Sequence, residues 1–419
     1  MAIRALGLIA AGVKSGAKSG DWLNRERILA YGGIFLAFEF CGFIILAAEA
    51  HGWVGPPHPP VVADFVSFYA AGHLANLGLP AGAYIRSLHW AAEQQVAGPG
   101  INYALFVYPP VFLLICGLLA RLPYFAALLA FETLTMLLWV ATMLHILPKR
   151  GGRTDWLLLL PLMAFPAIFI NYGVGQNGFL TAALLGGGCL LVDRRPVLAG
   201  ILFGALCYKP HFGLLVPVAL IAGGRFRCFA AAAVTVIALI GLSAAAFGWD
   251  VWRSFIETFA GSQPIYSSGQ IKFDIFVSPF GALRLLGAGT KLALAAQGVA
   301  SVAAAAMVAW VWRRNSPLPV RGAVLASATL VAVPLTLYYD LLLAGVAIAW
   351  LIQDGCARGF GAWGKSLLLA LFLAPGLVLP LALLFRLPVG VIQTVALLAL
   401  CGAHAVRASD PVGRAAITP

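Results

Sequence analysis

Charged side chains are scarce in this chain of 419 residues: only 10% are Asp, Glu, Lys or Arg, and only 15 residues are acidic. Hydrophobic residues make up 62%, more than a soluble domain can bury in its interior. Lipid must therefore solvate most of the surface, and backbone polar groups in lipid are satisfied only in helices or closed barrels. The composition excludes a soluble globular enzyme.

The apolar runs lack the alternation of β-strands. They are long, as in ILAYGGIFLAFEFCGFIILAA and CFAAAAVTVIALIGLSAAAF. Each is close to the ~20 residues that a helix needs to cross the hydrocarbon core. The sequence therefore predicts an all-α fold, a polytopic transmembrane helical bundle of about 10–12 spans, with a single domain over residues 28–406.

Motifs for metals and disulfides are missing as well. The seven cysteines lie in or beside apolar runs, with no CxxC and no His/Cys ligand spacing, so we interpret them as small hydrophobic residues. No DxD pair is present to hold a divalent metal, and neither HExxH nor GxSxG occurs. We expect no metal and no other cofactor.

The net charge of +12 is distributed in short clusters between apolar runs rather than in a patch for nucleic acid. Such clusters of Lys and Arg are typical of cytoplasmic loops. We therefore expect residues 1–27 and 407–419 to be cytoplasmic and nucleic acid not to be a partner. The clusters are Arg25 and Arg27, Lys149 and Arg150, Arg194 and Arg195, Arg225 and Arg227, and Arg313 and Arg314.

Two longer polar segments, 51–103 and 249–275, are expected on the outer side. In the first, PPHPP interrupts regular structure, and helical spacing predicts short interfacial helices near 65–76 and 81–96. The run YPPVFLLICGLLARL is predicted to be half-buried or re-entrant on this side. A full crossing there would place Lys149 and Arg150 outside, against the charge rule.

Short apolar segments with polar breaks point to a site. Segments 197–209 and 211–223 flank Lys209-Pro210-His211, and Tyr338-Tyr339-Asp340 precedes a short run at 341–353. Thirteen helical residues reach only ~20 Å, so these polar breaks are predicted to lie at membrane depth. Polar groups persist there where they line a cavity.

Asp64, in VVADFVSFYAAG, is an acid just beyond the first apolar run. It is either a helix N-cap or a carboxylate base that takes a proton from a hydroxyl. Lys209 is either a lysine that extends to the headgroups or the partner of a bound anion, because an unpaired cation in lipid costs a few kcal/mol.

Six motifs occur in one order over residues 60–345: ADFVSFYAAG, YPPVF, GVGQNGFLTAALL, RRPVLAGILFGALCYKPHFGLLVPVAL, FGWDVW and YYDLLL. Together they resemble glycosyltransferase family 87, a branch of the polyprenyl-phosphate-dependent GT-C transferases. The resemblance implies inverting transfer of mannose or a similar sugar from a polyprenyl phosphate carrier, on the outer face of a bacterial inner membrane. It maps the family's acidic base onto Asp64. The acceptor stays open between a glycolipid, a glycan and a protein.

Further candidate substrate contacts each have a structural alternative. His211 could bind the phosphate or only pack; Gln176 and Asn177 could bind sugar hydroxyls or cap a helix. Tyr339 and Asp340 could hold the sugar, although Asp340 could pair with Lys209 or Lys272. The remaining candidates are Tyr69 and Tyr108, as sugar platforms or interface anchors, and Lys272, as a contact to an anionic acceptor.

A transporter or lipid flippase is the rival hypothesis, because broken apolar segments also form midplane binding sites in transporters. The chain has no evident internal repeat, which argues against it. A third alternative is a non-catalytic homologue that binds lipid or a protein partner, which would retain Lys209 and tolerate the loss of Asp64.

Overall fold

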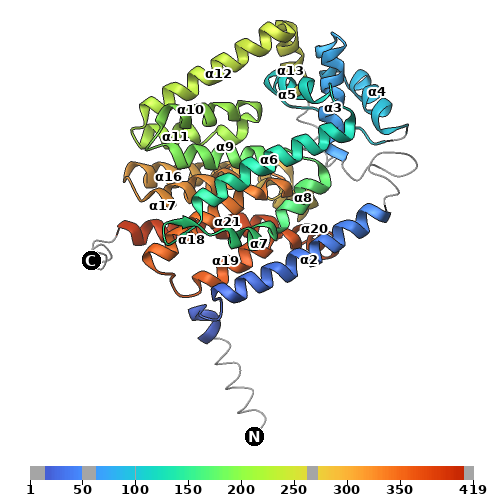
Figure 1. Ribbon diagram of the computed structural model, residues 1–419. Coiled ribbons are helices and arrows are strands. Elements are labelled where there is room, and N and C mark those ends of the chain that lie inside the picture. Colours follow the sequence, from blue (N-terminus) through green and yellow to red (C-terminus); the bar gives the residue numbers. More distant parts are fainter. Residues whose placement is uncertain (1–14, 50–62, 100, 262–271, 410–419) are drawn as a thin grey trace.

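The computed structural model describes residues 15–49, 63–99, 101–261 and 272–409, and Figure 1 shows that they are almost entirely helical. Within these residues the one strand pair is antiparallel, β1 (Lys149–Arg150) with β2 (Arg153–Thr154). The predicted all-α fold is therefore confirmed. The outermost parts of the expected cytoplasmic ends, and residues 51–62 and 262–271 of the expected outer loops, lie outside the described residues.

The longest helices correspond to the long apolar runs. They are α2 (Arg25–Glu49), α6 (Tyr124–Ile146), α12 (Phe226–Phe247), α16 (Thr290–Arg313), α18 (Leu342–Arg358) and α21 (Val389–Ser409).

The shorter α-helices are α3 (Ala63–Asn76), α4 (Arg86–Ala97), α5 (Pro110–Leu119), α7 (Leu159–Met163), α8 (Pro166–Val174), α9 (Gly178–Leu191), α10 (Pro196–Ala205), α11 (Val216–Ala222), α13 (Trp249–Gly261), α15 (Pro279–Leu285), α17 (Leu318–Ala332), α19 (Gly364–Leu373) and α20 (Pro375–Phe385). Single 3₁₀ turns are η1 (Pro80–Tyr84), η2 (Trp156–Leu158), η3 (Leu206–Tyr208), η4 (Pro210–Gly213), η5 (Phe273–Ile275) and η6 (Tyr338–Leu341).

Five segments of the described chain are long and apolar enough to cross a membrane, and the number is seven if two bent helix pairs each count as one span. The bends are 63° between α7 and α8 and 65° between α19 and α20. This number is lower than the predicted 10–12. The reason is that other predicted spans, such as α9 and α17, form helices of fewer than 18 residues.

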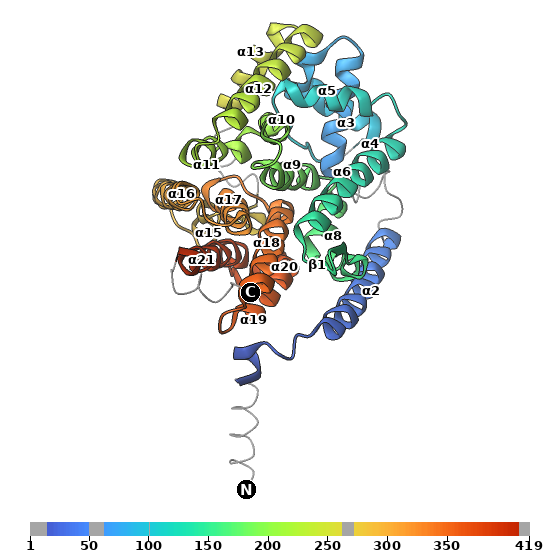
Figure 2. The ribbon, with the colours of Figure 1, turned by 60° about the vertical axis from the view of Figure 1, so that its left-hand side comes forward.

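The chain has two distinct ends along its long helices. Figure 1 shows α3, α4, α5 and α13 gathered together, and Figure 2 shows the same group from another side. We name this group the Asp64 end. The other end, which carries the arginines at the starts of α10 and α12 and at the end of α16, is named the basic end.

Helix α5 stays at the Asp64 end, as the charge pattern predicts. Its ten residues extend about 15 Å, too short to cross the hydrocarbon core. Arg25 at the start of α2 pairs with Asp155 at 2.8 Å, just after the strand pair that carries Lys149 and Arg150. These two basic clusters therefore lie at the same end of the molecule.

Helices α17 and α18 form the centre of the core and pack on α9. Every residue from Val320 to Ala332 is buried, which is typical of a helix surrounded by other helices. This packing fixes the turn from Leu337 to Leu341, which lies between α17 and α18. Figure 2 shows α17 and α18 between α16 and α6.

Helix α3 crosses α5 so closely that only glycine fits at position 72. A Cβ there would lie 2.0 Å from the Cys116 carbonyl oxygen. Beside this crossing, Phe68 packs edge-on against Phe112 and Tyr108, with ring centroids 5.0 and 5.2 Å away. The position of the first turn of α3 is therefore set by rigid aromatic packing.

Helix α4 holds α3 from its other side through His89 and Glu93, both fully buried. His89 Nε2 contacts the Ser67 carbonyl oxygen at 3.0 Å, and His89 Nδ1 lies 3.4 Å from Glu93 Oε1. Burial raises the pKa of Glu93 to about 8 and lowers the pKa of His89 to about 4. Between these values Glu93 keeps its proton and the His89 ring is uncharged.

This pair makes the stability of the α3–α4 contact depend on pH. Above pH 6.5 the unfolded chain has lost both protons, since the ordinary pKa values are 6.5 and 4.5, but the folded chain keeps one up to about pH 8. The free energy of unfolding should therefore fall by about 2 kcal/mol between pH 6.5 and 8 through this pair. Glu93→Gln should remove that part of the slope in detergent unfolding curves. Glu257→Gln on exposed α13 should retain it, and an unchanged slope in Glu93→Gln would contradict the assignment.

Candidate active site

Asp64 lies in the first turn of α3, with its side chain half-buried. Its Oδ2 accepts a hydrogen bond of 3.0 Å from Gln176 Nε2. Burial raises the pKa of Asp64 above its ordinary value, although the hydrogen bond from Gln176 and the charge of Lys209 act in the opposite direction. An acid is stabilised in the first turn of a helix, so this position alone is explained by the helix. The Asp64 carboxylate, however, also binds Gln176 from a distant segment. A carboxylate with a raised pKa is a better base than one in water.

Gln176 and Asn177 lie in the tight turn between α8 and α9. Helix α8 ends at Val174 and is capped by Gly175, whose φ of 68° lies in the left-handed region that favours glycine. Asn171 then closes the turn, because its Nδ2 donates to the Gln176 carbonyl at 2.8 Å and its Oδ1 accepts from Gly178 N at 2.9 Å. A Cβ at Gly178 would lie 2.6 Å from Asn171 Oδ1, so the turn requires glycine there.

The Gln176 side chain is held on both sides. Its Oε1 accepts hydrogen bonds from the Tyr108 hydroxyl at 3.2 Å and from Asn177 N at 3.1 Å. The amide is thereby oriented so that Nε2 donates to Asp64. The Asp64 carboxylate is therefore positioned by two hydrogen bonds in series, from the backbone N–H of Asn177 to Gln176 and from Gln176 to Asp64.

Lys209 is buried between η3 and η4. Its Nζ donates to Asp340 Oδ1 at 2.6 Å and to Asn177 Oδ1 at 3.1 Å. The Nζ also lies 4.6 Å from the ring centroid of Phe212 and 5.1 Å from that of Tyr339. It therefore does not extend to the headgroups, and Asp340 pairs with Lys209 rather than with Lys272.

Asp64 and Lys209 are brought together by two consecutive residues. Gln176 binds the carboxylate and Asn177 binds the ammonium, and the charge of Lys209 acts on Asp64. The Nδ2 of Asn177 is buried and has no acceptor among the described residues. We name Asp64, Gln176, Asn177, Lys209 and Asp340 the polar bridge.

The other predicted residues fall into two groups. Tyr108 and Tyr339 touch the polar bridge, and half-buried His211 packs on Phe212 with a centroid distance of 5.0 Å. Tyr69 is directed away, because its hydroxyl donates to the Leu122 carbonyl at 2.9 Å and ties α3 to the turn before α6. Lys272 is exposed, and in the described part of the chain no hydrogen bond or ion pair joins it to the polar bridge.

Sequence reasoning missed Glu132, which lies on α6 and is almost fully buried. Its Oε2 accepts a hydrogen bond of 3.0 Å from Asn171, the residue that closes the Gln176–Asn177 turn. Its Oε1 has no donor among the described residues. The signal was the single acid in YFAALLAFETLTMLLWVATMLHI, because an acid inside a span is a functional candidate by default.

Two glycine patterns match the spacing of nucleotide-binding loops, GVGQNG at 173–178 and GFGAWGKS at 359–366. Such loops follow a strand, whereas α8 and α18 precede these two. In the loop at 359–366, Lys365 Nζ lies 3.8 Å from Asp21 Oδ1, and the Ser366 hydroxyl donates to the Ala17 carbonyl at 2.6 Å. Neither loop has the setting of a nucleotide site. Among the described residues, no three His, Cys, Asp or Glu side chains gather in a way that could hold a metal.

Comparison with known proteins gives one result. The family model of glycosyltransferase family 87 matches residues 106–337, which is more than half of the chain. No curated protein and no solved structure matches the chain. The matched region contains Gln176, Asn177 and Lys209, whereas Asp64 precedes it and Asp340 follows it. The chain belongs to glycosyltransferase family 87 and is an integral membrane glycosyltransferase.

Proposed function

We propose that this protein transfers a sugar from a polyprenyl phosphate carrier to a hydroxyl group of an acceptor, with Asp64 as the base and Lys209 as the phosphate partner. The observation that carries the proposal is the polar bridge. It sets a carboxylate and a buried ammonium on neighbouring residues of one turn, Gln176 and Asn177. Sugar transfer from a phosphate ester is accelerated by a base for the attacking hydroxyl and a cation for the leaving phosphate.

Asp64 acts on the acceptor. Gln176 holds Oδ2, and the other oxygen takes the proton of the attacking hydroxyl. The acceptor oxygen then bonds to the anomeric carbon as the bond from that carbon to the phosphate oxygen breaks. This single displacement inverts the anomeric centre, so a β-linked donor yields an α-linked product.

Lys209 acts on the donor. An ammonium has three hydrogens, of which Asp340 and Asn177 take two, so the third is available to a phosphate oxygen. Negative charge grows on that oxygen as the sugar leaves, and a preformed cation in a dry site stabilises it strongly. His211, two residues further along the chain, is the proposed donor of a second hydrogen bond to the same phosphate. The reaction so described uses no metal or other cofactor.

Several polar groups are suited to the sugar. The unsatisfied Nδ2 of Asn177 donates to a hydroxyl, while Tyr108 and Tyr339 provide aromatic surfaces beside the polar bridge. We assign mannose or a similar hexose as the sugar and the outer face of a bacterial inner membrane as the location of the reaction. A glycolipid, a lipid-linked glycan or a protein can serve as acceptor.

The base is tested by Asp64→Asn in proteoliposomes supplied with polyprenyl-phosphate-linked mannose and membrane glycolipids. The rate of mannosyl product formation, followed by mass spectrometry, should fall by about 10²–10⁴-fold because the hydroxyl proton has no acceptor. The matched control is Asp250→Asn, an exposed acid on α13 at the same end, which should keep wild-type activity. If the activity of Asp64→Asn is within twofold of wild type, Asp64 is not the base. Passage of the carrier across the bilayer without any glycosidic product would favour a transporter.

The phosphate partner is tested by Lys209→Met, which keeps the apolar stem and removes the charge. The KM for the polyprenyl-phosphate donor should rise about tenfold or more, while the KM for the acceptor stays unchanged. Because Asp340 is then buried without its cation, Lys209→Met/Asp340→Leu serves as a second variant that removes both charges. This double variant should fold and should still bind the donor weakly. Lys291→Met, an exposed lysine at the start of α16, is the control, and unchanged donor KM in both Lys209 variants would refute the role.

A further inference from the structure

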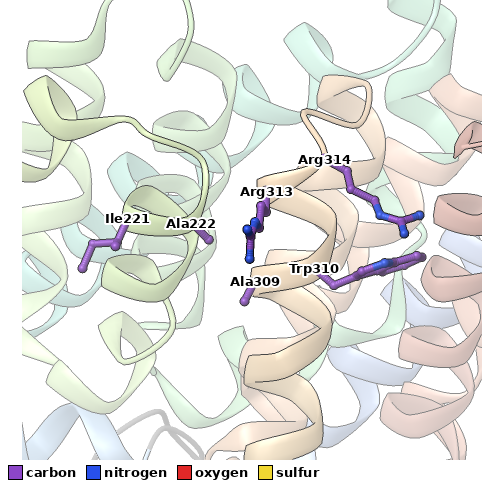
Figure 3. A pocket seen from close by; sticks show the side chains of 6 residues that line it. All are labelled: Ile221, Ala222, Ala309, Trp310, Arg313 and Arg314. Carbon is purple, nitrogen blue, oxygen red and sulfur yellow. The ribbon is translucent and has the colours of Figure 1, made fainter.

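A groove opens at the basic end between α11 and α16, far along the helices from the polar bridge. Its volume is about 840 Å³. Figure 3 shows Arg313 beside Ala309 in the space between the two helices, and Arg314 extended over Trp310 on the other side of α16. The residues that line it are Ile221, Ala222, Ala309, Trp310, Arg313 and Arg314.

The two arginines carry charge that the described residues do not compensate. Neither Arg313 nor Arg314 forms an ion pair with a described side chain, whereas neighbouring Arg225 and Arg321 share Asp193. Arg314 lies 4.9 Å from the ring centroid of Trp310, which limits the directions in which its guanidinium can turn. The groove therefore presents two positive charges without an anion among the described residues, and the Trp310 ring restrains one of them.

The rest of the groove is apolar. Ile221 is 53% exposed, although it is a large aliphatic residue, and Ala222 and Ala309 continue the apolar wall. Both helices are apolar along their length, so this wall continues toward the hydrocarbon core. Trp310, next to the end of a long apolar helix, is of the type found at the headgroup level.

A ligand for this groove needs a phosphate at one end and a hydrocarbon chain at the other. We propose that the groove binds one anionic phospholipid of the surrounding bilayer, with its phosphate on Arg313, an acyl chain along Ile221 and Ala222, and Arg314 as a second positive charge near the headgroup. Positive charge at this end also orients the protein in the membrane. Orientation alone, however, requires neither an apolar wall beside the charges nor a guanidinium stacked on tryptophan. Basic pockets between membrane helices are suited to acidic headgroups.

The experiment measures lipid binding to the full chain in detergent by native mass spectrometry. Phosphatidylglycerol should bind as one tight adduct and phosphatidylcholine should not. Arg313→Gln/Arg314→Gln should weaken the phosphatidylglycerol adduct about tenfold or more. The matched control is Arg194→Gln/Arg195→Gln, which removes two exposed arginines at the same end but outside the groove and should leave the adduct unchanged.

A second variant keeps the test independent of the stability of the arginine double variant. Ile221→Glu places a carboxylate in the groove at an exposed position and should also weaken the adduct, because it repels a phosphate and attracts Arg313. Equal binding of phosphatidylcholine, or equal loss in the Arg194/Arg195 control, would overturn the proposal in favour of general surface charge. Displacement of the adduct by inorganic phosphate at equal concentration would overturn it in favour of a free anion site. None of these results depends on sugar transfer.

Discussion

The buried ion pair of Lys209 and Asp340 is the interaction on which the site depends. Two opposite charges in an apolar interior lose more hydration energy than their attraction returns unless further hydrogen bonds satisfy them. Here Asn177 Oδ1 and Leu337 N supply those bonds. Apolar residues of similar volume would stabilise the fold at least as well. The role of the Lys209–Asp340 pair is therefore better explained by reactivity than by stability. It keeps an ammonium at depth, charged and with one donor to spare.

The short helices follow from this pair. Helix α10 ends at η3, α11 begins after η4, and α17 ends at the turn before η6, so that their polar breaks meet inside the molecule. The freed backbone groups find local partners there, as in the Lys209 N to Leu206 O and Asp340 N to Leu337 O bonds. A full-length helix through either segment would remove the turn that carries the charge. The breaks in these helices therefore create the buried site. Non-helical backbone inside a membrane protein is stable where other protein segments surround it.

The sequence predicted the parts that depend on composition and local chemistry. Run length predicted the helices, and a lysine between apolar half-helices predicted the broken segment at Lys209. The sequence could not predict which amide meets which charge, because the bond between Gln176 and Asp64 joins residues 112 positions apart. The partner of the Tyr69 hydroxyl could not be predicted for the same reason, since the carbonyl that it binds belongs to a distant turn. Glu132, by contrast, was visible as a lone acid in an apolar helix.

The site is assembled from three parts of the chain, and only the middle part lies within the family match. In the proposed reaction the matched region provides the donor side, with Asn177 and Lys209 in the segments that α9, η3 and η4 position. Asp64, the proposed base, comes from α3, whose position is set by Phe68, by the close crossing at Gly72 and by the His89–Glu93 pair. These contacts lie outside α9, η3 and η4, so different parts of the chain set the positions of Asp64 and Lys209. If Asp64 serves the acceptor as proposed, a change in acceptor preference would arise most directly in α3 and α4, whereas Asn177 and Lys209 would continue to bind the donor.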